Sequence, residues 1–186
     1  MIHYISAERL TIARVEEILC KGYKLALSED AKRRINHCRE YLDQKTKTVG
    51  RPIYGVTTGF GSLCNISVEE EGLSQLQKNL MMSHACGTGQ RVPSEIARLM
   101  ILLKVQSLSY GHSGVQLITV ERLIDMFNNN IIPVVYEQGS LGASGDLSPL
   151  AHMCLPLLGL GHVEIDGEVV EGSVMMEKMG WTPITL

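Results

Sequence analysis

Two glycine-rich segments interrupt a sequence that is otherwise patterned for helices, and they constrain the fold more than any other feature. Residues 49–61 contain four glycines and a proline, and residues 139–145 contain three glycines, two serines and an alanine. Glycine and proline at this density do not support a helix, so both segments are predicted to be loops. Loops held on a helical scaffold often carry binding and catalytic residues, so function is sought there first.

Apolar residues recur at helical spacing through most of the remaining chain. Thr11 and Ser28 are predicted to cap the first two helices, and Gly22 is predicted to end the first of them. Pro93 is expected to begin a later helix. Its predicted apolar face consists of Ile96, Leu99, Met100, Leu103 and Val105. Further helices are expected over residues 70–85, 115–127, 148–158 and 175–179.

Few segments show strand character. Residues 131–136 are predicted to be extended because Pro133 disfavours a helix there. Residues 162–171 alternate around Asp166-Gly167, which predicts a β-hairpin with a tight turn. The predicted fold class is therefore mainly α with one small β-hairpin. Ser148-Pro149 is expected to supply the N-cap and first turn of the helix over 148–158.

Composition limits the class of protein. The 186 residues, 45% of them hydrophobic, suit one domain or at most two small ones. The net charge of -3 gives no reason to expect a nucleic-acid partner. Five scattered cysteines without a Cys-x-x-Cys pair predict neither a zinc knuckle nor a redox dithiol. The first residues lack the apolar segment of a signal peptide, and no apolar stretch is long enough to span a bilayer. We expect a cytoplasmic protein with no membrane partner and no metal or nucleotide.

The second glycine-rich segment can react with itself. Its spacing matches neither a nucleophile elbow nor a phosphate-binding or dinucleotide-binding loop. Within Ala143-Ser144-Gly145, the Gly145 nitrogen is an unhindered nucleophile and glycine permits the bend that brings it onto the Ala143 carbonyl. That attack closes an imidazolone ring with loss of water, and loss of the Ser144 hydroxyl as a second water leaves an exocyclic methylidene. By itself the tripeptide is more often a flexible turn.

Three runs in the same order resemble the aromatic amino acid lyases, whose prosthetic group is this methylidene-imidazolone. The longest is Gly139-Ser-Leu-Gly-Ala-Ser-Gly-Asp-Leu-Ser-Pro-Leu-Ala-His-Met153. The others are Tyr54-Gly-Val-Thr-Thr-Gly-Phe-Gly61 and Leu76-Gln-Lys-Asn-Leu-Met-Met-Ser-His-Ala-Cys-Gly87. The resemblance covers nearly the whole chain. It implies the N-terminal part of the aspartase-like lyase fold, with residues 1–186 as the domain that bears the prosthetic group and without the central long-helix bundle.

The resemblance also assigns roles to residues. It implies that Ala143, Ser144 and Gly145 form the group autocatalytically and that Tyr54 is the base that removes the β-hydrogen. Phe60 and Gly61 are implied to close over the substrate, and His84 is implied to contact its side chain. Asp146 directly follows the three ring-forming residues in the motif, so the resemblance implies that it belongs to the same site. The implied catalytic set is Tyr54, Ala143, Ser144 and Gly145.

Other interpretations stay open from the residues alone. Tyr54 can be a packed loop tyrosine, and His84 can be an ordinary core histidine. Asp146 can orient the ring precursors or cap the following helix. His152 is expected to pack. Ser83-His84 resembles the histidine-specific members, which implies non-oxidative elimination of ammonia from L-histidine to give urocanate, the first step of histidine degradation.

The chain departs from the family pattern in ways that leave its activity open. Thr57 stands where the family has asparagine, and Tyr136 stands where proline is common. Family members are more than twice as long, and the missing part supplies the residues that hold the substrate carboxylate. The alternatives are a non-catalytic remnant or oligomerising domain, a tyrosine or phenylalanine ammonia-lyase, and a 2,3-aminomutase. The resemblance implies an amino acid substrate and a homotetramer or a complementing C-terminal chain.

Overall fold

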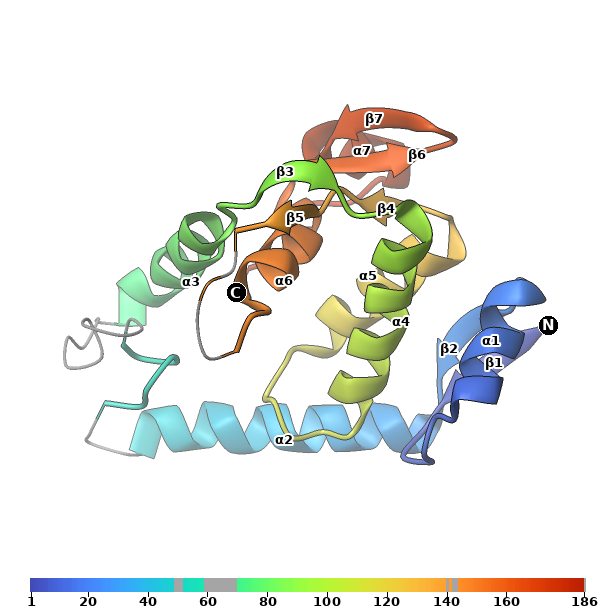
Figure 1. The fold of residues 1–186 in the computed structure, drawn as a ribbon. Coiled ribbons are helices and arrows are strands. Elements are labelled where there is room, and N and C mark those ends of the chain that lie inside the picture. The colour runs from blue at the N-terminus through green and yellow to red at the C-terminus, as the bar shows by residue number, and fades with distance from the viewer. Residues whose placement is uncertain (49–51, 59–69, 140, 142–143, 186) are drawn as a thin grey trace. The chain divides into compact units, whose positions relative to one another are not determined.

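The structure is a computed structural model, and most of the chain is described in it (Figure 1). The described residues are 1–48, 52–58, 70–139, 141 and 144–185. Helices dominate, as predicted. Two compact units can be distinguished, one formed by residues 1–42, 93–132 and 164–168 and the other by residues 43–92, 133–163 and 169–186. Within the described ranges, no helix combines the length and apolarity needed to cross a membrane.

The first unit is built on a parallel pair of strands that the sequence analysis missed. Strand β1 (Ile2–Ile5) pairs with β2 (Lys24–Leu27), and α1 (Ile12–Cys20) is the crossover between them. Both strands are only four residues long, at the lower limit for a period-two pattern to be recognised. Parallel pairing also depends on residues distant in sequence, which local patterns do not report.

Three further helices complete the first unit. They are α2 (Glu29–Thr48), which begins in it, α4 (Ser94–Ser109) and α5 (Leu117–Asn128). Helix α5 packs on β2 and on α4, and α4 also contacts β1. The two predicted N-caps are confirmed: Thr11 Oγ1 accepts a hydrogen bond from Arg14 N and Ser28 Oγ accepts one from Ala31 N, both at 3.2 Å. Gly22, with φ +61°, follows the end of α1 as predicted.

The predicted apolar face of α4 is only partly correct. Ile96 is 46% exposed and Leu103 is 48% exposed. The residues that α4 buries include Ala97, Ile101, Leu102, Val105 and Leu108. Apolar side chains surround this helix on more than one side, so its hydrophobic periodicity did not select the stripe that packs.

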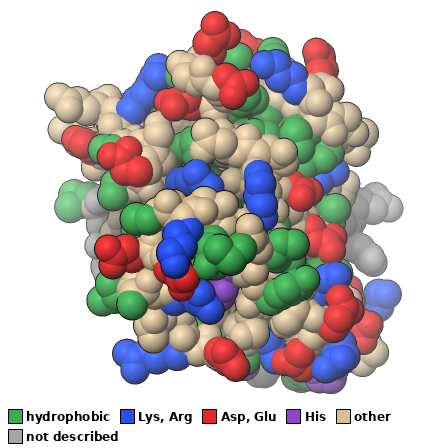
Figure 2. All heavy atoms as spheres, turned by 90° about the vertical axis from the view of Figure 1, so that its right-hand side faces the viewer, with side chains coloured by type: hydrophobic (Ala, Val, Ile, Leu, Met, Phe, Trp, Pro, Cys, Tyr) green, Lys and Arg blue, Asp and Glu red, His purple; other side chains and the backbone are tan. Residues whose placement is uncertain are grey.

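Charged side chains of both signs lie close together on the surface. Figure 2 shows Lys/Arg and Asp/Glu side chains interspersed with apolar ones over one face. Many pair along their own helix: Glu17 of α1 binds Arg14 at 2.5 Å and Lys21 at 3.0 Å. Tyr23 also donates to Glu17, and these three donors lower the pKa of its carboxyl to about 2, with Lys21 as the largest contributor. Because these groups are exposed, the pairs add little to stability.

The second unit carries both glycine-rich segments. Its helices are α3 (Glu70–His84), α6 (Leu147–Cys154), the single-turn 3-10 helix η2 (Leu155–Leu158) and α7 (Gly172–Met179). Strand β3 (Thr88–Arg91) pairs antiparallel with β5 (Tyr136–Gln138). Helix α6 packs against α3, and η2 packs against α7. The fully buried side chains among the described residues here include Val135, Met153, Leu157, Val163 and Met175.

A three-stranded sheet has the order β4-β6-β7, with bounds Ile132–Pro133, His162–Ile165 and Glu168–Glu171. The predicted hairpin is confirmed as β6 and β7. Asp166 and Gly167 join the strands with φ +53° and +83°. Positive φ at both central residues is the geometry of a type I′ turn, which Asp-Gly adopts readily.

The start of α6 differs from the prediction. The helix begins at Leu147, with Asp146 as its N-cap, and Ser148 lies inside the helix with only 3% exposure. Pro149 is compatible with this start, because the first residues of a helix do not need their N–H groups for intrahelical bonds. The last turn of the predicted 148–158 helix is the 3-10 helix η2.

Candidate active site

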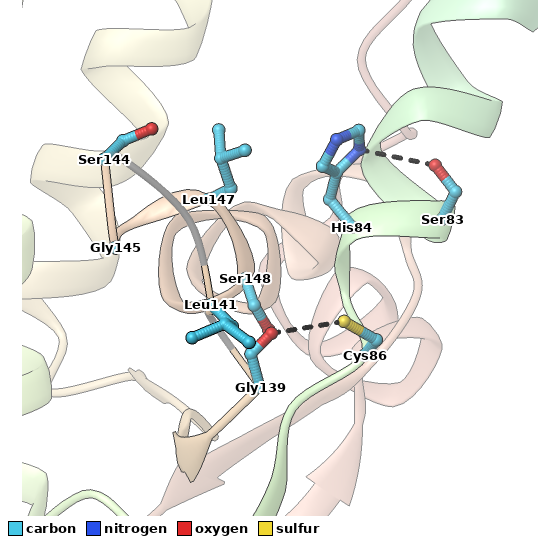
Figure 3. A pocket seen from close by; sticks show the side chains of 9 residues that line it. All are labelled: Ser83, His84, Cys86, Gly139, Leu141, Ser144, Gly145, Leu147 and Ser148. Atoms are coloured by element: carbon cyan, nitrogen blue, oxygen red, sulfur yellow. Dashed lines mark hydrogen bonds between the residues drawn. The ribbon is translucent and has the colours of Figure 1, made fainter. Parts of the chain in front are cut away.

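A pocket of about 190 Å³ lies in the second unit, between the end of α3 and the start of α6 (Figure 3). It brings together two of the three runs singled out in the sequence. Ser83 and His84 come from α3, and Ser144 and Gly145 come from the second glycine-rich segment. The remaining lining residues are Cys86, Gly139, Leu141, Leu147 and Ser148.

Close backbone packing holds the two walls of the pocket in place. The antiparallel pairing of β3 with β5 brings the segment after α3 alongside the segment before α6. Cys86 Sγ lies 3.4 Å from the Gly139 carbonyl oxygen. A Cβ atom added at Gly139 would lie 2.6 Å from Gly87 Cα, which is far inside van der Waals contact. Gly139 also has φ +139°, so both space and conformation require glycine there.

His84 is oriented by its own helix. Its Nδ1 lies 2.6 Å from the Leu80 carbonyl oxygen and 3.3 Å from Ser83 Oγ, which itself donates to Leu80 O. A contact this short with a carbonyl requires the proton of a neutral imidazole to be on Nδ1. Nε2 is then the acceptor atom of the ring. In Figure 3, Leu147 lies between His84 and Ser144.

Ser144 and Gly145 form an exposed bend immediately before α6. Gly145 has φ +70°, and a Cβ atom built on it would meet none of the described residues within 4 Å. The glycine is thus needed for its backbone conformation rather than for space. Ala143 lies outside the described residues, as do Phe60 and Gly61. Asp146 is exposed at the N-cap position of α6, and its side chain makes no capping hydrogen bond.

His152 packs against Gly87 and Tyr136, in keeping with the expectation from sequence. Its Nε2 accepts a hydrogen bond from Gly87 N at 2.9 Å, and its ring meets Tyr136 edge-on, with 5.2 Å between centroids. Burial lowers the pKa of His152 below its ordinary value. Sequence reasoning did not find the bond to Gly87, because nothing near either residue indicates that they meet.

Tyr54 lies in a turn formed by residues 52–58 and is 62% exposed. It is not among the described residues that line the pocket. Thr57 contributes to this turn directly, since its Oγ1 accepts from Ile53 N at 2.8 Å. Two hydrogen bonds from Gln77 of α3 join the turn to that helix. Gln77 was also missed from sequence, although it lies within one of the three runs.

Comparison with known proteins identifies the family. The model of the aromatic amino acid lyases matches residues 10–186, nearly the whole chain. The chain belongs to the aromatic amino acid lyase family. The family resemblance carried by the three runs is therefore confirmed, and so is the fold that it implied.

Lyases and aminomutases are similar over nearly the whole chain. The histidine ammonia-lyase of Caldanaerobacter subterraneus subsp. tengcongensis is 46% identical over 98% of this chain and 36% of its own length. The solved histidine ammonia-lyase of Trypanosoma cruzi has a TM-score of 0.87 at 31% identity, and the tyrosine aminomutase of Streptomyces globisporus has 0.90 at 31%. This chain covers all of its own length in both matches, but 36% and 35% of theirs. The chain thus spans about a third of the length of these relatives.

The stability of this lyase-family chain should fall with acid through His152. Because burial lowers the folded-state pKa, the unfolded chain takes up the proton first. The contribution of neutral His152 is complete above its unfolded-state pKa of about 6.5 and is lost as the pH falls towards the lower folded-state value. His152→Phe should destabilise the chain by about 1–3 kcal/mol at pH 8, because the Gly87 N–H loses its acceptor. Its unfolding free energy should also depend less on pH than that of wild type.

Urea denaturation at about pH 8 and about pH 5.5 measures both effects, on either side of the ordinary histidine pKa. His162→Phe is the control, since His162 is exposed. If His152→Phe and His162→Phe show the same pH dependence, His152 is not the responsible group.

Proposed function

We propose that the chain is the N-terminal, prosthetic-group-bearing part of a histidine ammonia-lyase, which eliminates ammonia from L-histidine without oxidation and yields urocanate. The observation that carries this proposal is the pocket in which Ser144 and Gly145 lie with His84. The 46% identity to a histidine ammonia-lyase supports the substrate assignment. Residues 1–186 act as one functional domain in this proposal, in the cytoplasm and within a homo-oligomer.

The residues fit a methylidene-imidazolone formed from positions 143–145. Gly145 adopts a left-handed conformation that a ring-forming bend can use, and a Cβ atom built on it would approach none of the described residues within 4 Å. Ser144 is exposed at the pocket, so the methylidene carbon derived from it would face the substrate. Once formed, the group supplies an electrophile that captures the substrate amine and makes it a better leaving group.

The other residues bind the substrate and move its proton. His84, with its Nδ1 proton directed to Leu80 O, presents Nε2 as an acceptor for an N–H of the substrate imidazole. Tyr54 removes the β-hydrogen, and Phe60 and Gly61 close over the bound substrate. Asp146 adjoins the ring-forming residues at the start of α6 and orients them.

A direct test is mass spectrometry of the peptide that contains residues 143–145. We expect it to be lighter than its sequence by two waters, with the near-ultraviolet absorbance of the conjugated ring. The substrate is tested in a chimaera that joins residues 1–186 to the part of the Caldanaerobacter enzyme beyond the match. Urocanate production from L-histidine supports the proposal.

A 2,3-aminomutase is the second candidate, because the Streptomyces globisporus tyrosine aminomutase has a TM-score of 0.90. A β-amino acid product from the chimaera would favour it. Full-mass peptide together with an inactive chimaera would favour a non-catalytic remnant.

A further inference from the structure

Gln77 of α3 binds two successive carbonyl groups of the turn that carries Tyr54. Its Nε2 lies 3.3 Å from Gly55 O and 3.3 Å from Val56 O. A carboxamide nitrogen has two hydrogens, so one side chain can donate to both oxygens. Gln77 is half-buried, so these bonds are partly shielded from water.

The turn that Gln77 binds is closed by its own hydrogen bonds. Val56 N and Thr57 N donate to Ile53 O at 3.1 Å and 2.9 Å, and Thr57 Oγ1 accepts from Ile53 N. Gly55 N donates to Thr58 Oγ1 at 3.3 Å. These bonds tie the backbone on both sides of Tyr54 together. A bond to its carbonyls therefore restrains the backbone that carries Tyr54.

Gln77 and His84 lie on one helix and on one side of it. They are seven positions apart, which corresponds to two turns and about 10 Å along the axis. Helix α3 thus carries the histidine that lines the pocket and the anchor of the tyrosine turn. A displacement of the turn relative to α3 would change the distance between Tyr54 and a substrate held by His84.

We propose that Gln77 is a positioning residue: its carboxamide fastens the Tyr54 turn to α3 and so sets the position of the base relative to a substrate bound at His84. This inference rests on the proposed function, in which Tyr54 is the base. Gln77 acts through the backbone of residues 55 and 56. It is therefore expected to affect proton removal and not substrate affinity or ring formation.

Two substitutions remove the anchor in different ways. Gln77→Leu keeps the volume and loses both donors. Gln77→Glu keeps the shape and directs carboxylate oxygens towards two carbonyl oxygens. Gln75→Leu is the matched control, because Gln75 is an exposed glutamine on the same helix that binds Asn79 at 2.7 Å.

Hydrogen–deuterium exchange on the 186-residue chain tests the anchor without any need for activity. Both Gln77 variants should exchange the amides of residues 53–58 about ten-fold faster, since one or two hydrogen bonds are lost. Exchange in β3 and β5 should stay unchanged, which shows that the fold is intact. Gln75→Leu should behave as wild type in both regions.

Kinetics of the chimaera test the consequence for the reaction. Gln77→Leu should lower kcat by about 10- to 100-fold, the size expected from a misplaced catalytic group, while KM changes by less than about threefold. The primary isotope effect with β-deuterated histidine should increase, because proton removal becomes slower. The loss of two waters from the 143–145 peptide should stay complete.

The outcomes separate the two proposals. Unchanged exchange in Gln77→Leu, or unchanged kcat and isotope effect in an active chimaera, overturns the role of Gln77 alone. A wild-type chimaera that is inactive and retains full-mass peptide refutes the proposed function and the positioning role together.

Discussion

Replacing Ser144 with alanine is expected to abolish lyase activity, with a loss on the order of 10³-fold or more. The amine is a poor leaving group, and without the Ser144 hydroxyl no second water can leave and no methylidene carbon can form. The variant peptide covering 143–145 should therefore lack the two-water loss, and the near-ultraviolet absorbance should be absent. Because Ser144 is exposed in a bend, the variant should fold as wild type does.

Ser74→Ala is the matched control, since Ser74 is an exposed serine on α3 outside the lining of the pocket. It should retain the mass loss and the activity of the chimaera. Measured together, mass and urocanate formation separate loss of the prosthetic group from loss of the fold. Full activity in Ser144→Ala would rule out a prosthetic group derived from this serine.

Much of the helical scaffold was predictable because capping residues and glycines mark the ends of helices in the local sequence. Thr11 and Ser28 cap their helices as predicted, and Asp166-Gly167 forms the expected turn. The predictions failed where tertiary packing decides which apolar side chains are buried. Ile96 and Leu103 look like core residues of α4 but remain exposed, because the helix has more apolar surface than this unit covers.

The candidate site was predictable to the extent that it lies in contiguous runs. Ser144, Gly145 and His84 were all identified from sequence, and the structure places them in one pocket. The residues that support the site were not identified. Gln77 and His152 act on partners 21 or more positions away, so their roles depend on tertiary structure that local spacing does not encode.

Replacing Tyr54 with phenylalanine should lower kcat of the chimaera by about 10²- to 10⁴-fold, the usual contribution of a positioned general base. The β-hydrogen of the substrate is scarcely acidic, and phenylalanine cannot accept it. The substitution removes one oxygen atom from a side chain that is 62% exposed, so the fold should not change. KM should change little, because His84 still binds the substrate side chain in the proposed mechanism.

Tyr41→Phe is the matched control, since Tyr41 has a similar exposure of 60% and lies outside the proposed site. Both variants should show the two-water loss at 143–145, because ring formation needs no group from the Tyr54 turn in this mechanism. Tyr54→Phe should therefore hold the electrophile and bind histidine but fail to remove the proton. If its kcat stays within about threefold of wild type, well below the loss expected for a general base, Tyr54 is not the base. The positioning role proposed for Gln77 would then have no consequence for the reaction.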